Sequence, residues 1–188
     1  MGRWEPNARE RLAAAALELY GERGYEQTTV AEIAKRAGLT ERTFFRHYAD
    51  KREVLFGGSG ELEELFVRAV AGTPSDAAPI EALAAGLDAA SEIFADRRPY
   101  ARARHAVIAA NAELKERELI KLASLSTALA GTLRGRGVPE PAASLAAEAG
   151  VAVFKVGYER WLAASEDRDL VQLVREALTE LKAVAAGG

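Results

Sequence analysis

The sequence contains no cysteine, and only two histidines and six prolines occur among its 188 residues. Without cysteine, the chain cannot form a disulfide framework, a thiolate metal site or a thiol nucleophile. No apolar run reaches the roughly 18–20 residues that a membrane-spanning helix needs, and the N-terminal segment is too charged for a secretory signal peptide. These absences predict a cytoplasmic protein with no membrane segment, no bound metal and no cofactor.

The residues that are abundant favour helices. Hydrophobic residues make up 49% of the chain, alanine and leucine are prominent among them, and long stretches contain no proline. This composition is typical of an all-α soluble protein. The net charge is −3, yet residues 1–56 carry ten basic and nine acidic residues and are therefore the more cationic part. A nucleic-acid-binding surface there would have to arise from local arrangement rather than from bulk charge.

Helix-start signals divide the N-terminal region into short helices. Asn7, Thr29 and Asp50 each precede a glutamate by three residues, which is the spacing of a capping box. Gly38 is placed to end the second helix, and Thr40 is a suitable N-cap for the third. Three short helices and the start of a fourth are therefore predicted within the first 56 residues.

The remainder of the chain also shows helical periodicity. We expect the fourth helix to run from residue 51 to about residue 70, weakened but not broken by the glycines of residues 57–64. Residues 71–79 form the clearest loop. Five further helices are predicted at residues 79–95, 97–110, 112–135, 140–163 and 168–185. The total is about nine helices, with four in a small N-terminal unit and five in a larger C-terminal bundle.

The second and third helices have the spacing of a helix-turn-helix motif, with Gly38 in the tight turn. Only Phe44 and Tyr48, four residues apart, give the third helix an apolar face for packing. Its other face mixes hydrogen-bonding, cationic and aromatic side chains: Glu41, Arg42, Thr43, Phe45 and Arg46. Such a face suits a helix that enters the major groove of DNA. The alternative, two short core helices of an ordinary bundle, does not explain this mixed face.

The stretch GYEQTTVAEIAKRAGLTERTFFRHYADKREVL resembles the DNA-binding domain of TetR-family transcriptional regulators. The similarity covers residues 8–56, whereas the rest of the chain is similar only in length and helical layout. The resemblance implies a ligand-responsive repressor: a homodimer that a small-molecule effector releases from a palindromic double-stranded DNA operator. It also implies that residues 1–56 form the DNA-binding domain and residues 57–188 the ligand-binding and dimerisation domain, with the fourth helix as connector.

The candidate DNA-binding residues are Thr29, Thr40, Arg42, Thr43, Phe45, Arg46, His47 and Lys51. The first two cap helix starts, whose backbone N–H groups favour phosphate. The resemblance implies that Arg42 and Thr43 face base edges. It further implies that His47 and Lys51 hold the DNA backbone.

Phe45 and Arg46 stand where the family often has two tyrosines. Because Phe45 lacks a hydroxyl group, it can make only apolar contact, either with a sugar or with a thymine methyl group. Arg46 could replace a phosphate hydrogen bond with a charge-assisted one. Two interpretations stay open for Glu41: it accepts a hydrogen bond from cytosine N4, or it is a solvated charge at a helix start.

The resemblance also implies that the last two long helices, within residues 140–185, form the dimer interface. We expect Val153 and Leu178 to lie in this interface. Candidates for the ligand pocket are the larger side chains of the bundle: Phe66, Tyr100, His105, Phe154, Tyr158 and Trp161. Their helical spacing also fits simple core packing, so both roles stay open.

Two other classes of function fit less well. An enzyme is not indicated, since the chain has few histidines, no cysteine, no Gly-rich phosphate loop and no HExxH pattern. A helical adaptor that binds only protein would account for the C-terminal bundle but not for Arg42, Phe45 and Arg46 on the third helix. The sequence therefore predicts a DNA-binding regulator, with the adaptor as the alternative.

Overall fold

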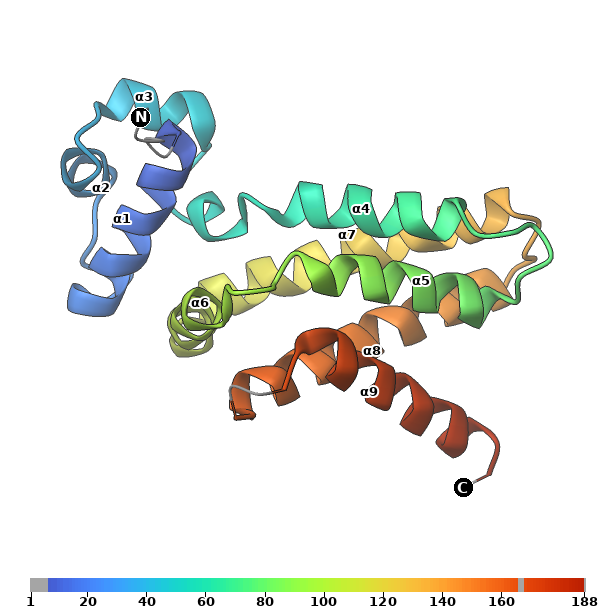
Figure 1. Cartoon of the computed structure of the whole chain (residues 1–188). Coiled ribbons are helices and arrows are strands. Elements are labelled where there is room, and N and C mark those ends of the chain that lie inside the picture. Colours follow the sequence, from blue (N-terminus) through green and yellow to red (C-terminus); the bar gives the residue numbers. More distant parts are fainter. Residues whose placement is uncertain (1–6, 166–167, 188) are drawn as a thin grey trace, which may run out of the picture. The chain divides into compact units, whose positions relative to one another are not determined.

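The computed structural model describes residues 7–165 and 168–187. Within these residues the chain forms nine α-helices and one 3₁₀ turn, and it contains no strand (Figure 1). The predicted all-α fold is therefore confirmed. None of the helices in the described ranges combines the length and the apolar composition that crossing a membrane requires.

The described residues divide into two compact units. Residues 7–59 and 102–119 form the first unit, and residues 60–101 and 120–187 form the second. The division near residue 59 lies close to the predicted boundary at residue 57. The sequence prediction, however, assigned residues 102–119 to the C-terminal domain. Three side chains of this segment are instead buried in the core of the first unit: Val107, Ile108 and Leu114.

The first unit is built on short helices whose starts follow the predicted capping signals. In chain order it contains α1 (Ala8–Arg23), α2 (Val30–Arg36), α3 (Glu41–His47) and the 3₁₀ turn η1 (Glu53–Phe56). The side chain of Asn7 accepts a hydrogen bond from the backbone N–H of Glu10 and so caps α1. Gly38 joins α2 to α3 with a positive φ of 67°, which glycine adopts without steric cost. The predicted helix-turn-helix is confirmed.

The prediction of one continuous fourth helix is wrong. After the turn η1, the helix α4 (Ser59–Ala71) begins separately. Three consecutive residues of η1 are all buried in the core of the first unit: Val54, Leu55 and Phe56. These three residues lie in a 3₁₀ turn that ends at Gly57, and not in a continuing α-helix. Gly57 then allows a close approach, because a Cβ atom there would lie 3.0 Å from Cε1 of Tyr48.

The second unit is a helical bundle. It contains α4, α5 (Pro79–Glu92), the start of α6 (Arg98–Ala110), most of α7 (Ala112–Gly135), α8 (Ala142–Ala163) and α9 (Leu170–Ala185). The five predicted C-terminal helices are all present, with ends within three residues of the expected ones. Helices α8 and α9 pack side by side, and α5 packs against both (Figure 1).

The residues expected at the dimer interface lie elsewhere. Val153 is 3% exposed and Leu178 is 6% exposed within a single chain, so both belong to the core of the second unit. The expectation that they form an intermolecular surface is therefore wrong. The two side chains are buried because α8 and α9 pack within the bundle through these positions.

Candidate functional sites

Helix α3 has one buried and one exposed face, as predicted. Phe44 is completely buried, and Tyr48, which follows the helix, is 5% exposed. Phe45, by contrast, is 57% exposed. Arg42 and Arg46 are also exposed. The helix therefore packs against the core through Phe44 and Tyr48, and it exposes two guanidinium groups and one aromatic ring to solvent.

The hydroxyl groups at the start of α3 bond to each other. The Oγ1 atom of Thr40 accepts a hydrogen bond from the backbone N–H of Thr43 at 3.2 Å, which caps the helix. The two Oγ1 atoms of Thr40 and Thr43 lie 3.0 Å apart. Both candidate residues thus have a demonstrated role in fixing the start of the helix.

Helix α2 begins with the predicted capping box. The backbone N–H of Thr29 donates to Oε2 of Glu32 at 2.9 Å, and the backbone N–H of Glu32 donates to Oγ1 of Thr29 at 3.3 Å. The hydrogen bond from the Thr29 backbone holds the pKa of Glu32 below its usual value. The carboxylate of Glu32 also pairs with Arg23 at 2.8 Å. These bonds fix the direction in which α2 leaves the preceding loop.

Lys51 has local partners that the sequence did not reveal. Its ammonium group donates to the backbone carbonyl oxygens of Tyr25 at 2.9 Å, Thr28 at 3.1 Å and Glu26 at 3.4 Å. It also lies 4.3 Å from the centre of the Tyr25 ring. An ammonium group has three N–H donors, and this loop provides three acceptors. Lys51 therefore ties the loop between α1 and α2 to the segment before η1.

The backbone of Lys51 is held as well. Its carbonyl oxygen accepts a hydrogen bond of 2.6 Å from the hydroxyl group of Tyr20. Burial raises the pKa of Tyr20 above its usual range, so this phenol stays protonated and keeps donating. Lys51 is thus connected to α1 through its backbone and to the following loop through its side chain.

The side chains of Arg46 and His47, the last two residues of α3, lie close together. Nη2 of Arg46 is 3.5 Å from Nε2 of His47, and His47 is half-buried. Arg46 is exposed, so its guanidinium can still reach an outside partner. Of the eight candidate DNA contacts, Arg42, Phe45 and Arg46 are the ones that the structure leaves most exposed on α3.

Charged side chains attach residues 102–119 to the first unit. Arg52 pairs with Asp50 at 2.6 Å and with Glu113 at 3.1 Å, and its hydrogen bond to Asp50 lowers the pKa of that carboxyl group. Arg117 pairs with Glu53 at 2.5 Å. This attachment was not predicted from the sequence, since Arg52 and Glu113, like Glu53 and Arg117, are far apart along the chain.

Arg104 adds a contact between α6 and the turn η1. Its Nε atom donates to the carbonyl oxygen of Leu55 at 2.7 Å, and its guanidinium lies 5.0 Å from the centre of the Phe56 ring. It also pairs with Glu118 of α7 at 3.2 Å. The middle of α6 is therefore held to the turn η1 that follows the helix-turn-helix.

Four of the six candidate ligand residues come together in the second unit. The rings of Phe66, Phe154, Tyr158 and Trp161 form a cluster with Phe94. Tyr100, by contrast, is 42% exposed on α6, and His105 belongs to the first unit. Because Phe66, Phe154 and Trp161 are all buried in a single chain, they contribute to the core whether or not a ligand binds beside them.

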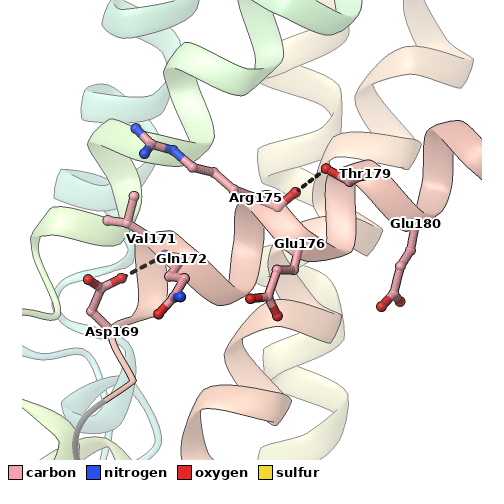
Figure 2. Close-up of a pocket in the computed structure, with 7 residues that line it drawn as sticks. All are labelled: Asp169, Val171, Gln172, Arg175, Glu176, Thr179 and Glu180. Carbon is pink, nitrogen blue, oxygen red and sulfur yellow. Dashed lines mark hydrogen bonds between the residues drawn. The ribbon is translucent and has the colours of Figure 1, made fainter.

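A surface groove runs along α9, and none of the clustered aromatic residues lines it. It is lined by Asp169, Val171, Gln172, Arg175, Glu176, Thr179 and Glu180 (Figure 2). Its charged groups already have partners in neighbouring elements: Arg175 pairs with Asp88, and Glu176 pairs with Arg160 and Arg168. None of the ligand residues predicted from the sequence lines this groove.

An apolar stripe is exposed on α8. Leu145 is 67% exposed and Val156 is 45% exposed, which is unusual for large apolar side chains. Ala149 and Ala152 lie between them at helical spacing, and Ala152 is also exposed. The four residues lie on one face of the helix. This stripe is distinct from the buried positions Val153 and Leu178.

Comparison with known proteins gives two matches to family models. Residues 12–56 match the model described as bacterial regulatory proteins, tetR family. Residues 77–186, more than half of the chain, match the model described as the MftR C-terminal domain. The first match covers the helix-turn-helix, and the second covers most of the bundle.

Individual proteins are similar to parts or to all of the chain. The transcriptional regulator TcmR from Streptomyces glaucescens is 40% identical over 75 residues, which are 40% of this chain and 33% of TcmR. The aligned regions thus span about a third of the curated relatives that the chain matches. The crystal structure of FadR from Bacillus subtilis in complex with stearoyl-CoA is 22% identical, with a TM-score of 0.63, and covers 90% of this chain and 95% of FadR. The SmeT–triclosan complex is 20% identical, with a TM-score of 0.64, and covers 95% and 91%. At these identities, the two structures establish similarity of fold.

Proposed function

Because the chain belongs to the tetR family of bacterial regulatory proteins, we propose that it is a ligand-responsive DNA-binding repressor that a small molecule releases from a palindromic operator. The observation that carries this proposal is the exposed face of α3. Arg42 and Arg46 extend from a helix whose opposite face is anchored by the buried Phe44. A helix of this kind fits the major groove, where guanidinium groups can bind guanine or phosphate. A protein-binding adaptor would not need this surface.

Arg42 provides the test of this proposal. It lies at the second position of α3, where side chains of a recognition helix contact base edges. Its guanidinium can donate two hydrogen bonds to O6 and N7 of guanine. We expect Arg42→Ala to weaken binding to a DNA site selected from a random pool by about 1–3 kcal/mol, and to relax the preference at one base pair per half-site.

The measurement is fluorescence anisotropy on the selected site and on its single-base variants. Glu10→Ala, on an exposed turn of α1, is the matched control and should keep the base preference. An Arg42→Ala protein that binds every variant with the same ranking as the wild type would contradict the assignment of α3 as the reading helix.

We also propose that the chain is a homodimer through the apolar stripe on α8. Leu145 and Val156 are exposed in one chain, and a second copy could bury them around a two-fold axis. The small side chains of Ala149 and Ala152 would let two helices approach closely. This stripe replaces the interface residues that were expected from the sequence.

We expect the double variant Leu145→Glu, Val156→Glu to be a folded monomer, because buried carboxylates would disfavour association without touching the core. Analytical ultracentrifugation at micromolar concentration measures the change, and circular dichroism checks the fold. The control Val153→Glu should instead unfold the bundle, since that side chain is 3% exposed. A dimeric double variant would exclude this interface.

The small-molecule effector is proposed to bind beside the aromatic cluster of Phe66, Phe94, Phe154, Tyr158 and Trp161. Five neighbouring rings favour a ligand with a large apolar part. Stearoyl-CoA and triclosan, which the similar FadR and SmeT structures contain, are suitable first probes. A probe that weakens operator binding must itself bind more weakly, by the same factor, when the operator is saturating. Unchanged affinity would exclude that probe as an effector.

A further inference from the structure

One feature of α3 is unusual for a helix whose exposed face is otherwise polar. Phe45 is 57% exposed. Its neighbours along the chain are the buried Phe44 and the exposed Arg46, and Thr43 is half-buried. Exposing the ring of Phe45 to water is unfavourable in the free protein. An exposed aromatic ring on a binding face gains free energy when a partner covers it.

The ring of Phe45 packs against the ring of Phe44. Its centre lies 5.4 Å from the centre of the Phe44 ring, and the two planes meet at 80° in an edge-to-face contact. Phe44 is completely buried. Because the supporting ring is fixed in the core, the orientation of the exposed ring is restrained before DNA binds.

The direction of helical side chains places this ring near the reading end of α3. Side chains in an α-helix lean toward the N-terminus, so Phe45 covers surface one turn earlier, beside Glu41 and Arg42. Residues 41, 42 and 45 are separated by three or four positions and share one face. Phe45 therefore approaches the same base pairs as the proposed base-reading Arg42.

The chemistry of the ring limits what it can recognise there. Phenylalanine has no hydrogen-bond donor or acceptor, and the methyl group of thymine is the one apolar group that base edges present in the major groove. We propose that Phe45 is a specificity-determining residue that packs on a thymine methyl group in each half-site. This inference rests on the proposed function of α3 as the recognition helix. It adds that α3 selects a thymine at one position of each half-site through Phe45.

The contact can be tested by removing the methyl group alone. The wild-type protein selects a site from random DNA, and each thymine of that site is replaced in turn by deoxyuridine. We expect one position per half-site at which the replacement weakens binding about fourfold, and about sixteenfold when both half-sites are changed, from the value of one buried methylene-sized group. At that position Phe45→Ala should bind thymine and deoxyuridine equally.

Two variants separate this contact from general effects. Phe45→Leu keeps an apolar side chain and should keep part of the discrimination, whereas Arg46→Ala should lower affinity for thymine and deoxyuridine sites alike. Melting temperatures close to the wild type should accompany each variant, because both side chains are exposed.

A wild type that tolerates deoxyuridine at every position would overturn the inference, as would an unchanged deoxyuridine penalty in Phe45→Ala. Uniform weakening of Phe45→Ala on all sites would indicate a sugar contact and also overturn it. Failure to select any site would instead overturn the proposed function itself.

Discussion

Replacing Phe44 by alanine is expected to reduce the free energy of unfolding of the first unit by about 3–5 kcal/mol. The side chain is completely buried, and its ring packs against those of Phe45 at 5.4 Å and Tyr48 at 5.7 Å. Removing the ring would leave a cavity that the short helix α3 cannot close by itself. Thermal and denaturant unfolding, followed by circular dichroism, measure this loss.

The neighbouring Phe45 is the matched control, since it is the same residue type but its side chain is exposed rather than buried. Phe45→Ala should change the melting temperature little, because its ring is 57% exposed. If Phe44→Ala melted like the wild type while Phe45→Ala unfolded the first unit, Phe45 and not Phe44 would be the residue of α3 that packs in the core. The assignment of Arg42 and Arg46 to the exposed face would then also fail.

Replacing Lys51 by methionine is expected to cost about 2–3 kcal/mol of stability. Methionine keeps the apolar stem but removes three charge-assisted hydrogen bonds to the carbonyl groups of Tyr25, Glu26 and Thr28, and hydrogen bonds to charged groups contribute about 1.5–3 kcal/mol. It also removes the contact with the Tyr25 ring. The loop before α2 would lose its attachment to the segment before η1. The measurement is denaturant unfolding of the variant beside the wild type.

Arg46→Met supplies the comparison for Lys51→Met. Arg46 is exposed, so its removal should leave the melting temperature unchanged and lower the salt dependence of DNA binding by about one unit per half-site. The resemblance to TetR-family DNA-binding domains implied a contact of Lys51 with the DNA backbone, and a phosphate contact would give Lys51 this second behaviour. A Lys51→Met protein with normal stability and a reduced salt dependence would support the phosphate contact and contradict the structural role.

The sequence predicted best those features that depend on neighbouring residues. The caps at Asn7, Thr29 and Thr40 form as expected because donor and acceptor are three residues apart. The faces of α3 were also predictable, since Phe44 and Tyr48 are four residues apart and helical geometry places them together. Local spacing was sufficient in each case.

The features that were missed depend on contacts between distant parts of the chain. The partners of Lys51 are backbone carbonyl groups more than twenty residues earlier, and carbonyl groups leave no pattern in a sequence. The burial of Val107, Ile108 and Leu114 in the first unit depends on where α6 ends in space. Val153 was assigned to the wrong surface because a core and an interface require the same apolar residue types.

The most direct test of the account is to select bound fragments from a pool of random DNA with the wild-type protein and to sequence them. A dimer that presents α3 from each protomer should enrich one site with two-fold symmetry, whose half-sites are separated by about one helical turn or a multiple of it. Its affinity for that site should fall steeply as the salt concentration rises. A sequenced pool without any enriched motif, together with binding that salt does not weaken, would contradict the claim that this chain is a DNA-binding regulator.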